Sequence, residues 1–244
     1  MTFVIPMAGR GERFTKAGFV KPKMLIEVHG KTLLEWSIDS LPLSLCTNLV
    51  FICLKEHEQN FQISKFISDK YGQYENIIKF VYLDEVTRGQ AETVLKGREY
   101  FFIDDDLLIF NIDTYFYSPT LKQDLLRDDV DGILGAFHSS EDRFSFARVD
   151  KDGIVVETAE KKVISNNALT GLYHFKKASD FIKIAEKHID SDIRTKGEFY
   201  IAPMYNELIQ EGKKYIINMV EDHWILGTPD ELNLFKKQSL EKND

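Results

Sequence analysis

Glycines and cationic side chains lie close together near the start of the chain, directly after a short apolar run. Gly9 and Gly11 follow the apolar residues 3–5, and Arg13 and Lys23 come soon after them. Glycine lets backbone amides approach an anion closely, and lysine and arginine neutralise its charge. This stretch therefore predicts a cradle for a polyphosphate.

Two common phosphate-binding loops do not fit this stretch. A dinucleotide fingerprint needs a third glycine where Phe14 stands, and a Walker A loop needs a Gly-Lys-Ser/Thr triplet that the chain lacks. What remains is G-x-G-x-R-F, with Pro22-Lys23 beginning eight residues after Phe14. The glycine pair alone is as typical of an ordinary turn, so the specificity of the pattern comes from Arg13 and Pro22-Lys23.

A second candidate position is Asp113, just after the apolar segment 107–112. Ligands of open α/β sheets bind at the carboxyl ends of the strands. Mg²⁺ is usually held by one or two carboxylates together with phosphate oxygens. We therefore expect Asp113 to bind Mg²⁺, and Asn111 to contact the ribose or support the metal ligand. The acidic run 104–106 precedes this strand and is better explained as a solvated turn.

A third candidate is the segment 83–93, where a glycine again separates a predicted strand from a predicted helix. A carboxylate at Asp84 accepts hydrogen bonds, which suits the exocyclic amine of cytosine or guanine and not the carbonyl of uracil. A base-reading role for Asp84, which the family resemblance given below implies, would favour CTP as the nucleotide. A solvent-facing Asp84 at the end of a strand is an equal alternative.

These side chains need a framework, and the first half of the chain reads as alternating strands and helices. We expect strands at 3–5, 48–54, 77–83 and 107–112, and helices at 32–41, 57–71 and 89–101. Such alternation predicts right-handed crossovers and a mostly parallel sheet.

The second half is richer in strands. They are expected at 131–138, 144–150, 154–157 and 168–175, with helices at 178–188, 201–210 and from Pro229 onward. Thr228 and Glu231 are placed to form a capping box. We expect one domain, residues 1–244, with a nucleotide-binding half (1–130) and an acceptor-binding half (131–244).

Composition limits the function classes. The chain has a net charge of −8, which argues against a general nucleic-acid binder. No apolar stretch approaches the length of a membrane span, and the first one is too short for a signal peptide. We therefore expect a cytoplasmic protein without membrane partners. Cys46 and Cys53 show neither a disulfide framework nor a metal spacing, which favours two small core residues.

The whole pattern resembles the nucleotidyltransferases that make nucleoside-diphosphate sugars, over nearly the full length from Val4 to Leu232. The resemblance implies a Rossmann-like, GT-A-type α/β fold with a mixed, mostly parallel sheet and a β-rich acceptor half. It implies catalytic roles for Arg13, Lys23 and Lys161, and a metal on Asp113. It also implies a nucleotide site at Ala8, Gly9, Gly11, Asp84, Thr87, Gly89, Gln90 and Asn111, and an acceptor site at Glu160, Asn166, Gly171 and Glu198.

The chain departs from that family at one position. Many relatives carry Trp-x-Asp-x-Gly-Thr, whose aspartate is a second metal ligand, but here Trp224 is followed by Ile225 where the acid is expected. Asp222 or Glu221 is the candidate replacement, or Asp113 and the phosphates hold the metal alone.

The predicted reaction is transfer of a nucleoside monophosphate from an NTP, with CTP favoured, to a sugar or polyol phosphate, with release of pyrophosphate. The opening Ile-Pro-Met-Ala-Gly-Arg-Gly and the segment 198–203 are most similar to a bacterial capsule-gene subgroup. One alternative is a GT-A glycosyltransferase with a sugar-nucleotide donor, whose Asp-x-Asp motif would fall on 104–106 and leave Arg13 and Lys23 unexplained. The other is a non-catalytic nucleotide sensor, supported only by Ile225. Whether copies of the chain associate is left open.

Overall fold

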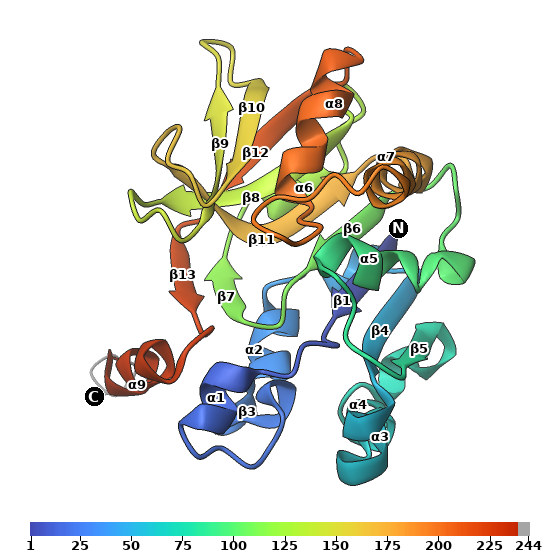
Figure 1. Cartoon of the computed structure of the whole chain (residues 1–244), viewed down its shortest axis with the longest axis vertical. Helices are drawn as coiled ribbons and strands as arrows, with labels where there is room; N and C mark the ends of the chain where they lie inside the picture. The colour runs from blue at the N-terminus through green and yellow to red at the C-terminus, as the bar shows by residue number, and fades with distance from the viewer. Residues whose placement is uncertain (239–244) are drawn as a thin grey trace.

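The computed structural model describes residues 1–238, and a mixed sheet of nine strands forms its centre (Figure 1). The strand order is β10-β9-β11-β6-β1-β4-β5, with β8 on β11 and β12 on β8. The strands are β1 (Thr2–Pro6), β4 (Asn48–Leu54), β5 (Ile78–Leu83), β6 (Leu107–Phe110), β8 (Gly132–His138), β9 (Ser145–Val149), β10 (Val155–Glu160), β11 (Asn167–Phe175) and β12 (Tyr215–Met219).

Strand direction differs between the two halves. β6, β1, β4 and β5 run parallel, whereas β11 is antiparallel to β6, β8 and β9. The predicted α/β class with a mixed sheet is confirmed, because β11 carries the sheet from the parallel half into the strand-rich half.

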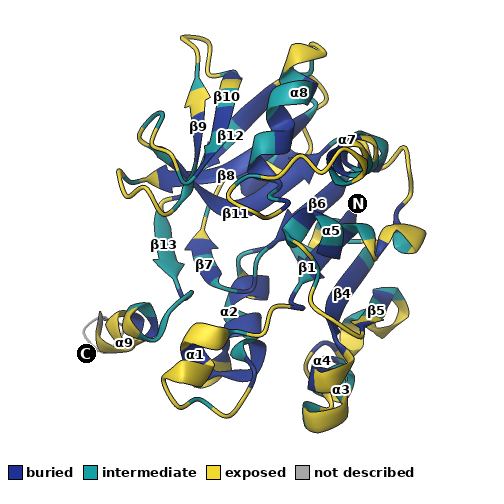
Figure 2. Cartoon of the chain, viewed as in Figure 1, coloured by how far each residue is buried: buried dark blue, intermediate teal, exposed yellow. Residues whose placement is uncertain are grey.

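Helices cover both faces of the sheet, which explains why its central strands are apolar throughout. On one face Phe51 and Phe110 pack against α2 (Leu33–Asp39), α4 (Ile63–Lys70) and α6 (Leu121–Leu125). On the other face Val50 and Ile109 pack against α5 (Gln90–Leu95), α7 (Ala178–Asp190) and α8 (Tyr205–Gln210). Figure 2 shows these strands buried, while α1 (Glu12–Lys16) and much of α3 (Lys55–Phe61) are exposed.

Three predicted helices differ from the structure. The segment 57–71 is broken into α3 and α4 at Gln62, whose φ of 51° is left-handed. The segment 89–101 stays α-helical only to Leu95, followed by a 3-10 turn at Arg98–Tyr100. The segment 201–210 begins as the 3-10 turn Ala202–Met204, which contains a proline, before α8. Shorter elements are β2 (Glu27–Val28), β3 (Lys31–Thr32) and 3-10 turns at Lys23–Leu25, Leu43–Leu45 and Gly72–Ile77.

A two-stranded ribbon that the sequence pattern did not predict stands below the main sheet. β7 (Thr114–Tyr117) pairs antiparallel with β13 (Asp222–Ile225), and α9 (Pro229–Gln238) follows (Figure 1). The sequence pattern also does not predict β12. Phe14, Leu226 and Phe235 share a small core here, so the last described helix packs beside the opening loop.

The cap of α9 is only half as predicted. The backbone amide of Glu231 donates to Thr228 Oγ1 at 3.2 Å. The carboxylate of Glu231, however, accepts from the guanidinium of Arg143 and does not return to Thr228. A charged partner across the fold has replaced the second half of the capping box.

Two smaller expectations concern cysteines and membrane spans. Cys53 is buried and Cys46 half-buried, and both thiols are free. Among the helices of residues 1–238, none has the length and apolar character needed to cross a bilayer.

Candidate active site

The opening loop leaves β1 and presents unused backbone donors. Within residues 1–238, the amides of Ala8, Gly9, Arg10 and Gly11 donate to no protein acceptor. Gly11 has φ +63°, and a Cβ there would stand 3.3 Å from the Cβ of Lys23. A loop with unpaired amides and room above Gly9 is what an anion requires.

The cationic side chains of this loop differ in their partners. Lys16 pairs with Glu12 and Lys21 with Glu27, both on the surface. Arg13 forms no ion pair within the described part of the chain. Arg13 is therefore available to an anionic ligand.

Lys23 and Asp113 meet although 90 residues separate them. Lys23 Nζ lies 2.7 Å from Asp113 Oδ2, and their side chains are 14% and 34% exposed. Asp113 stands between β6 and β7, at the carboxyl edge of the parallel strands. The two residues predicted to act on the reacting phosphates thus form one ion pair.

A cavity of about 420 Å³ opens over this ion pair. It brings together ten of the residues proposed from the sequence: Ala8, Gly9, Gly11, Lys23, Thr87, Gly89, Gln90, Asn111, Asp113 and Glu198. The nucleotide-binding candidates, with the exception of Asp84, therefore share one cavity.

A second cavity of about 310 Å³ adjoins the first through Asn111, Asp113 and Tyr200, which line both. It is lined by four further residues proposed from the sequence, Arg13, Glu160, Lys161 and Gly171, and also by Arg143. Two adjoining cavities thus meet beside the lysine–aspartate pair.

Asn111 is held between the two halves of the fold. Its Oδ1 accepts a hydrogen bond from Gln90 Nε2, and its backbone oxygen accepts from Ser37 Oγ at 2.6 Å. A Cβ at Gly171 would stand 2.3 Å from Asn111 Nδ2, and Gly171 has φ +89°. Gly171 thus makes room for the Asn111 side chain, at an irregularity in the β8–β11 pairing.

The acceptor-side candidates form a polar chain. Lys161 Nζ donates to the Tyr200 hydroxyl at 2.5 Å, and that hydroxyl donates to Glu198 Oε1 at 2.9 Å. Glu160 accepts from Ser145 Oγ. Burial raises the pKa of the Glu160 carboxyl, which the Ser145 hydrogen bond and Lys161 only partly offset. Burial and the neighbouring Glu198 carboxylate raise the pKa of the Tyr200 phenol.

The turn at Gly89 is locked to the segment that carries Glu198. Phe199 N donates to Arg88 O at 3.1 Å, and Ala91 N donates to Phe199 O at 3.0 Å. A Cβ at Gly89 would stand 2.3 Å from Phe199 N. The sequence suggested that Gly89 lets a ligand approach, but the group that approaches it most closely is this backbone.

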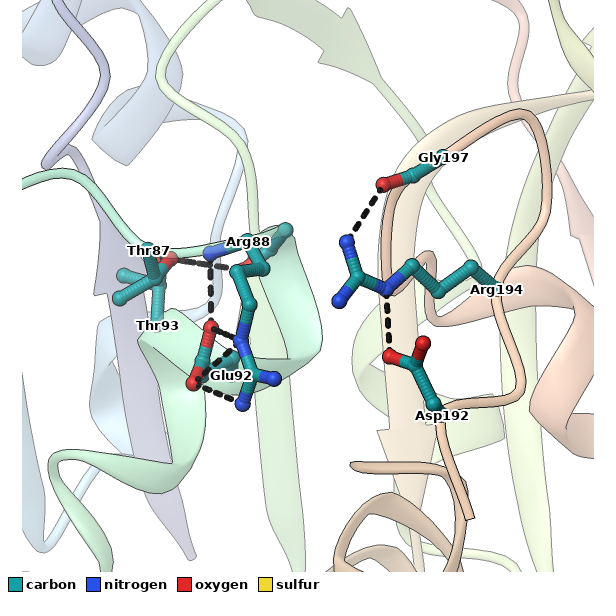
Figure 3. A network of polar contacts seen from close by, with 8 residues as sticks. Thr87, Arg88, Glu92, Thr93, Asp192, Arg194 and Gly197 are labelled. Carbon is teal, nitrogen blue, oxygen red and sulfur yellow. Dashed lines mark hydrogen bonds and ion pairs between the residues drawn. The ribbon is translucent and has the colours of Figure 1, made fainter. Parts of the chain in front are cut away.

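Two arginines enclose the buried Phe199 ring. The guanidinium carbons of Arg88 and Arg194 lie 5.1 and 5.0 Å from its centroid. Each is oriented by an acid, Arg88 by Glu92 and Arg194 by Asp192 (Figure 3). Thr87 and Thr93 complete the turn with a 2.5 Å contact between their hydroxyls. We call Arg88, Arg194 and the Phe199 ring between them the Phe199 clamp. It holds the turn at Gly89 against the segment that carries Glu198, and both segments line the first cavity.

Three residues proposed from the sequence lie apart from both cavities. Asp84 is exposed, pairs with Lys55 at 2.7 Å and lines a separate hollow of about 470 Å³ that shares Val86 and Thr87 with the first cavity. Asn166 is exposed in the loop before β11. Asp222 pairs with Tyr117 at one end of the β7–β13 ribbon, whereas Ile225, three residues on, pairs with Thr114 beside Asp113. Three residues along a strand span about 10 Å, so the structure does not bring Asp222 to Asp113.

Sequence reasoning missed Tyr200, Ser145 and Arg143 as site residues. Tyr200 follows Glu198 closely, and the alternation of a strand-like segment could have suggested that both face one side. Arg143 and Ser145 carry no local signal, because their places depend on distant partners: Arg143 in the loop before β9 binds Glu231 of α9, and Ser145 of β9 binds Glu160 of β10.

Comparison with known proteins agrees with this geometry. A family model described as a MobA-like NTP transferase domain matches residues 3–164. A solved nucleoside-diphosphate-sugar pyrophosphorylase from Vibrio cholerae RC9 is 35% identical, with a TM-score of 0.83 over 97% of this chain and 100% of that one.

Curated relatives are more distant. The bifunctional protein GlmU of Methanocaldococcus jannaschii is 26% identical over 87% of this chain and 48% of its own length. A glucose-1-phosphate thymidylyltransferase of Xanthomonas campestris is 26% identical over 73% of this chain and 61% of its own. The chain thus spans about half the length of the first of these relatives. With the family model covering most of its length, the chain belongs to the MobA-like family of nucleotidyltransferase domains.

Proposed function

We propose that this chain transfers a nucleoside monophosphate from an NTP to a phosphorylated sugar or polyol and releases pyrophosphate. The observation that carries the proposal is the pair of adjoining cavities, which share Asn111, Asp113 and Tyr200 and meet at the Lys23–Asp113 pair. One cavity has an anion-binding loop and the other has Lys161. That arrangement suits two phosphorylated substrates that must meet.

In the proposed reaction an oxygen of the acceptor phosphate attacks the α-phosphorus of the NTP. The bond from that phosphorus to the bridging oxygen breaks, and its electrons leave with pyrophosphate. The amides near Gly9 and Gly11, together with Arg13, bind the departing pyrophosphate. Lys23 and Lys161 neutralise the two phosphates that would otherwise repel each other. Positioning and charge stabilisation account for most of the acceleration in such transfers.

The family implies a divalent metal, and the residues at Asp113 fit one. A partly exposed carboxylate at the junction of the cavities is the kind of ligand that Mg²⁺ takes besides phosphate oxygens. When bound, Mg²⁺ would supply positive charge to the phosphates. Lys23 already neutralises Asp113 in the structure.

CTP is the nucleotide that we propose, with a phosphorylated polyol or sugar of a capsule or surface polysaccharide as acceptor. Support for CTP comes from the hydrogen-bond acceptor chemistry of Asp84, which lines a neighbouring cavity that shares Val86 and Thr87 with the first. Support for the capsule role comes from the sequence resemblance of the opening loop and the segment 198–203.

The test is pyrophosphate release with Mg²⁺, crossing four NTPs and dTTP with sugar 1-phosphates and polyol phosphates. We expect release with one pair. Lys23→Ala and Asp113→Ala should each lower kcat by about 10²–10³-fold, because each removes a charge from the reacting centre. Lys16→Ala, in the same loop but paired with Glu12 on the surface, is the control and should retain the wild-type rate.

Other outcomes would redirect the assignment. Wild-type rates in both variants would remove Lys23 and Asp113 from the reaction. Transfer from a finished sugar nucleotide without pyrophosphate release would favour the glycosyltransferase. Nucleotide binding without any turnover would favour the sensor.

A further inference from the structure

Glu231, in the first turn of α9, is a carboxylate for which the reaction above has no role. Its side chain is 15% exposed and lines the second cavity. Oε1 accepts from Arg143, but Oε2 is buried and has no hydrogen-bond partner within residues 1–238. An unsatisfied buried oxygen of a charged group is costly, so Oε2 calls for a positive partner.

The unsatisfied oxygen faces the same small space as Asp113. A methyl group built on Gly227 would stand 3.3 Å from Glu231 Oε2 and 3.5 Å from Asp113 Oδ2. The two carboxylates therefore flank the position that a side chain would fill at residue 227. Any side chain at residue 227 would crowd both oxygens, of which Asp113 Oδ2 also binds Lys23, and no left-handed backbone requires glycine there.

The donor set fits a hard cation that also binds substrate. Mg²⁺ prefers oxygen ligands and usually takes only one or two carboxylates, with phosphates and waters completing its shell. No group of three or more His, Cys, Asp or Glu side chains suited to a metal occurs within the described residues. A two-carboxylate site that is completed by polyphosphate is the arrangement open to this chain.

We infer that Glu231 acts with Asp113 as the second carboxylate ligand of the divalent metal, in place of the acid missing at Ile225. The inference rests on the proposed function for the identity of the phosphate ligands, but not for the two carboxylates. Arg143 holds Oε1, which leaves Oε2 directed at the shared space. The ligand thus comes from α9, six residues after the position where the sequence pattern expects it.

The experiment measures Mn²⁺ binding directly, by electron paramagnetic resonance of free Mn²⁺, with inorganic pyrophosphate present. Glu231→Gln keeps the size of the side chain and removes its charge. We expect it to raise the Kd for Mn²⁺ by about 10-fold or more. Glu141→Gln is the matched control, because Glu141 also binds Arg143, at 2.8 Å, but lies on the surface. It should bind Mn²⁺ as the wild type does.

A different result is expected if Glu231 only anchors α9 by its ion pair with Arg143. If Glu231→Gln lowers Tm but binds Mn²⁺ like the wild type, Glu231 is only an ion-pair partner of Arg143 and the inference is overturned. Absence of Mn²⁺ binding by the wild-type protein would overturn it as well. Should Glu231→Gln fail to fold, Gly227→Ala tests the same space without changing any charge, and it too should weaken Mn²⁺ binding.

Failure of the proposed function would look different. The wild-type protein could bind Mn²⁺ through Glu231 and yet release no pyrophosphate with any substrate pair. That result would support the metal site and overturn the proposed reaction. If the Glu231→Gln protein releases pyrophosphate and binds Mn²⁺ like the wild type, the proposed reaction stands and the role of Glu231 as a metal ligand is overturned.

Discussion

Asn111 shows how a single side chain links the two halves of this molecule. It follows β6 in the parallel half, accepts from Gln90 on α5, and lies against Gly171 on β11. It also lines both cavities. Any change that displaces Asn111 therefore alters both cavities at once.

Gly171→Ala tests this link. The added methyl would stand 2.3 Å from Asn111 Nδ2, so the amide must move. We expect kcat/KM to fall by about 10²-fold, the cost of a small misplacement in such sites. Gly212→Ala is the matched control, because Gly212 has the same φ of +89° but nothing within 4 Å of the added methyl.

The two variants should share the strain of a left-handed alanine, about 1–2 kcal/mol in the free energy of unfolding. They should differ in steady-state kinetics. Equal activity losses would show that backbone strain, and not Asn111, explains the effect.

At the scale of elements, the site depends on contacts between segments that are distant in sequence. The turn before α5 is joined to Phe199 by two backbone hydrogen bonds, and the guanidinium groups of Arg88 and Arg194 lie over the Phe199 ring. The β7–β13 ribbon carries Asp113 at one of its ends and leads into α9. These contacts, and not regular packing on the sheet, set the spacing of the charged groups.

Gly89→Ala should push the turn at residue 89 away from the Phe199 backbone. Its methyl would stand 2.3 Å from Phe199 N, so the turn and the 198–200 segment must part. We expect a loss of about 1–3 kcal/mol in the free energy of unfolding from overpacking, and a raised KM for both substrates. Denaturant unfolding and initial rates measure the two effects.

Gly197→Ala is the control for this loop. Gly197 also has a left-handed backbone, with φ +87°, but a methyl there meets nothing within 4 Å. It should keep the wild-type KM values. If Gly89→Ala behaves in the same way, the clamp does not position the substrate residues.

At the scale of the whole molecule, burial of histidines makes stability depend on pH. Burial lowers the pKa of His57, His174 and His223, and the carboxylates near each of them only partly offset it. Burial has the opposite effect on Glu160, whose raised pKa lets the folded chain take up a proton more easily. Because three histidines have a lowered pKa and one carboxyl has a raised pKa, we expect the histidines to determine the sign of the pH dependence.

We expect the free energy of unfolding to fall between pH 7.5 and 5.5. Above the unfolded histidine pKa of about 6.5, neither state is protonated and the histidines contribute nothing. As pH falls through that value, the unfolded chain takes up protons that the folded chain does not, and stability is lost. Urea unfolding across this range measures the slope.

His223→Gln isolates one contribution. It should reduce the slope by at most about 1.4 kcal/mol per pH unit, the value for one proton. His138→Gln, at an exposed position, should leave the slope unchanged. A stability that rises as pH falls through this range would contradict the prediction.

The sequence by itself determined the features that depend on local pattern. Apolar runs such as 48–54 and 107–112 predicted the buried strands, and glycine spacing with Arg13 and Lys23 predicted the phosphate loop. Asp113 followed from its place at the end of an apolar strand, and Lys161 and Glu198 from the family resemblance; the structure places all three in two adjoining cavities. These features need only neighbouring residues, so a linear pattern records them.

Tertiary structure alone decided which distant groups meet. The pairing of β7 with β13 places Asp222 at the end of the ribbon away from Asp113, and the return of α9 brings Glu231 there instead. Asp84 forms an ion pair with Lys55 at the surface, and Gly89 allows the close approach of the Phe199 backbone. Strand pairing and helix docking depend on packing across the fold, and no spacing along the chain encodes which carboxylate reaches the site.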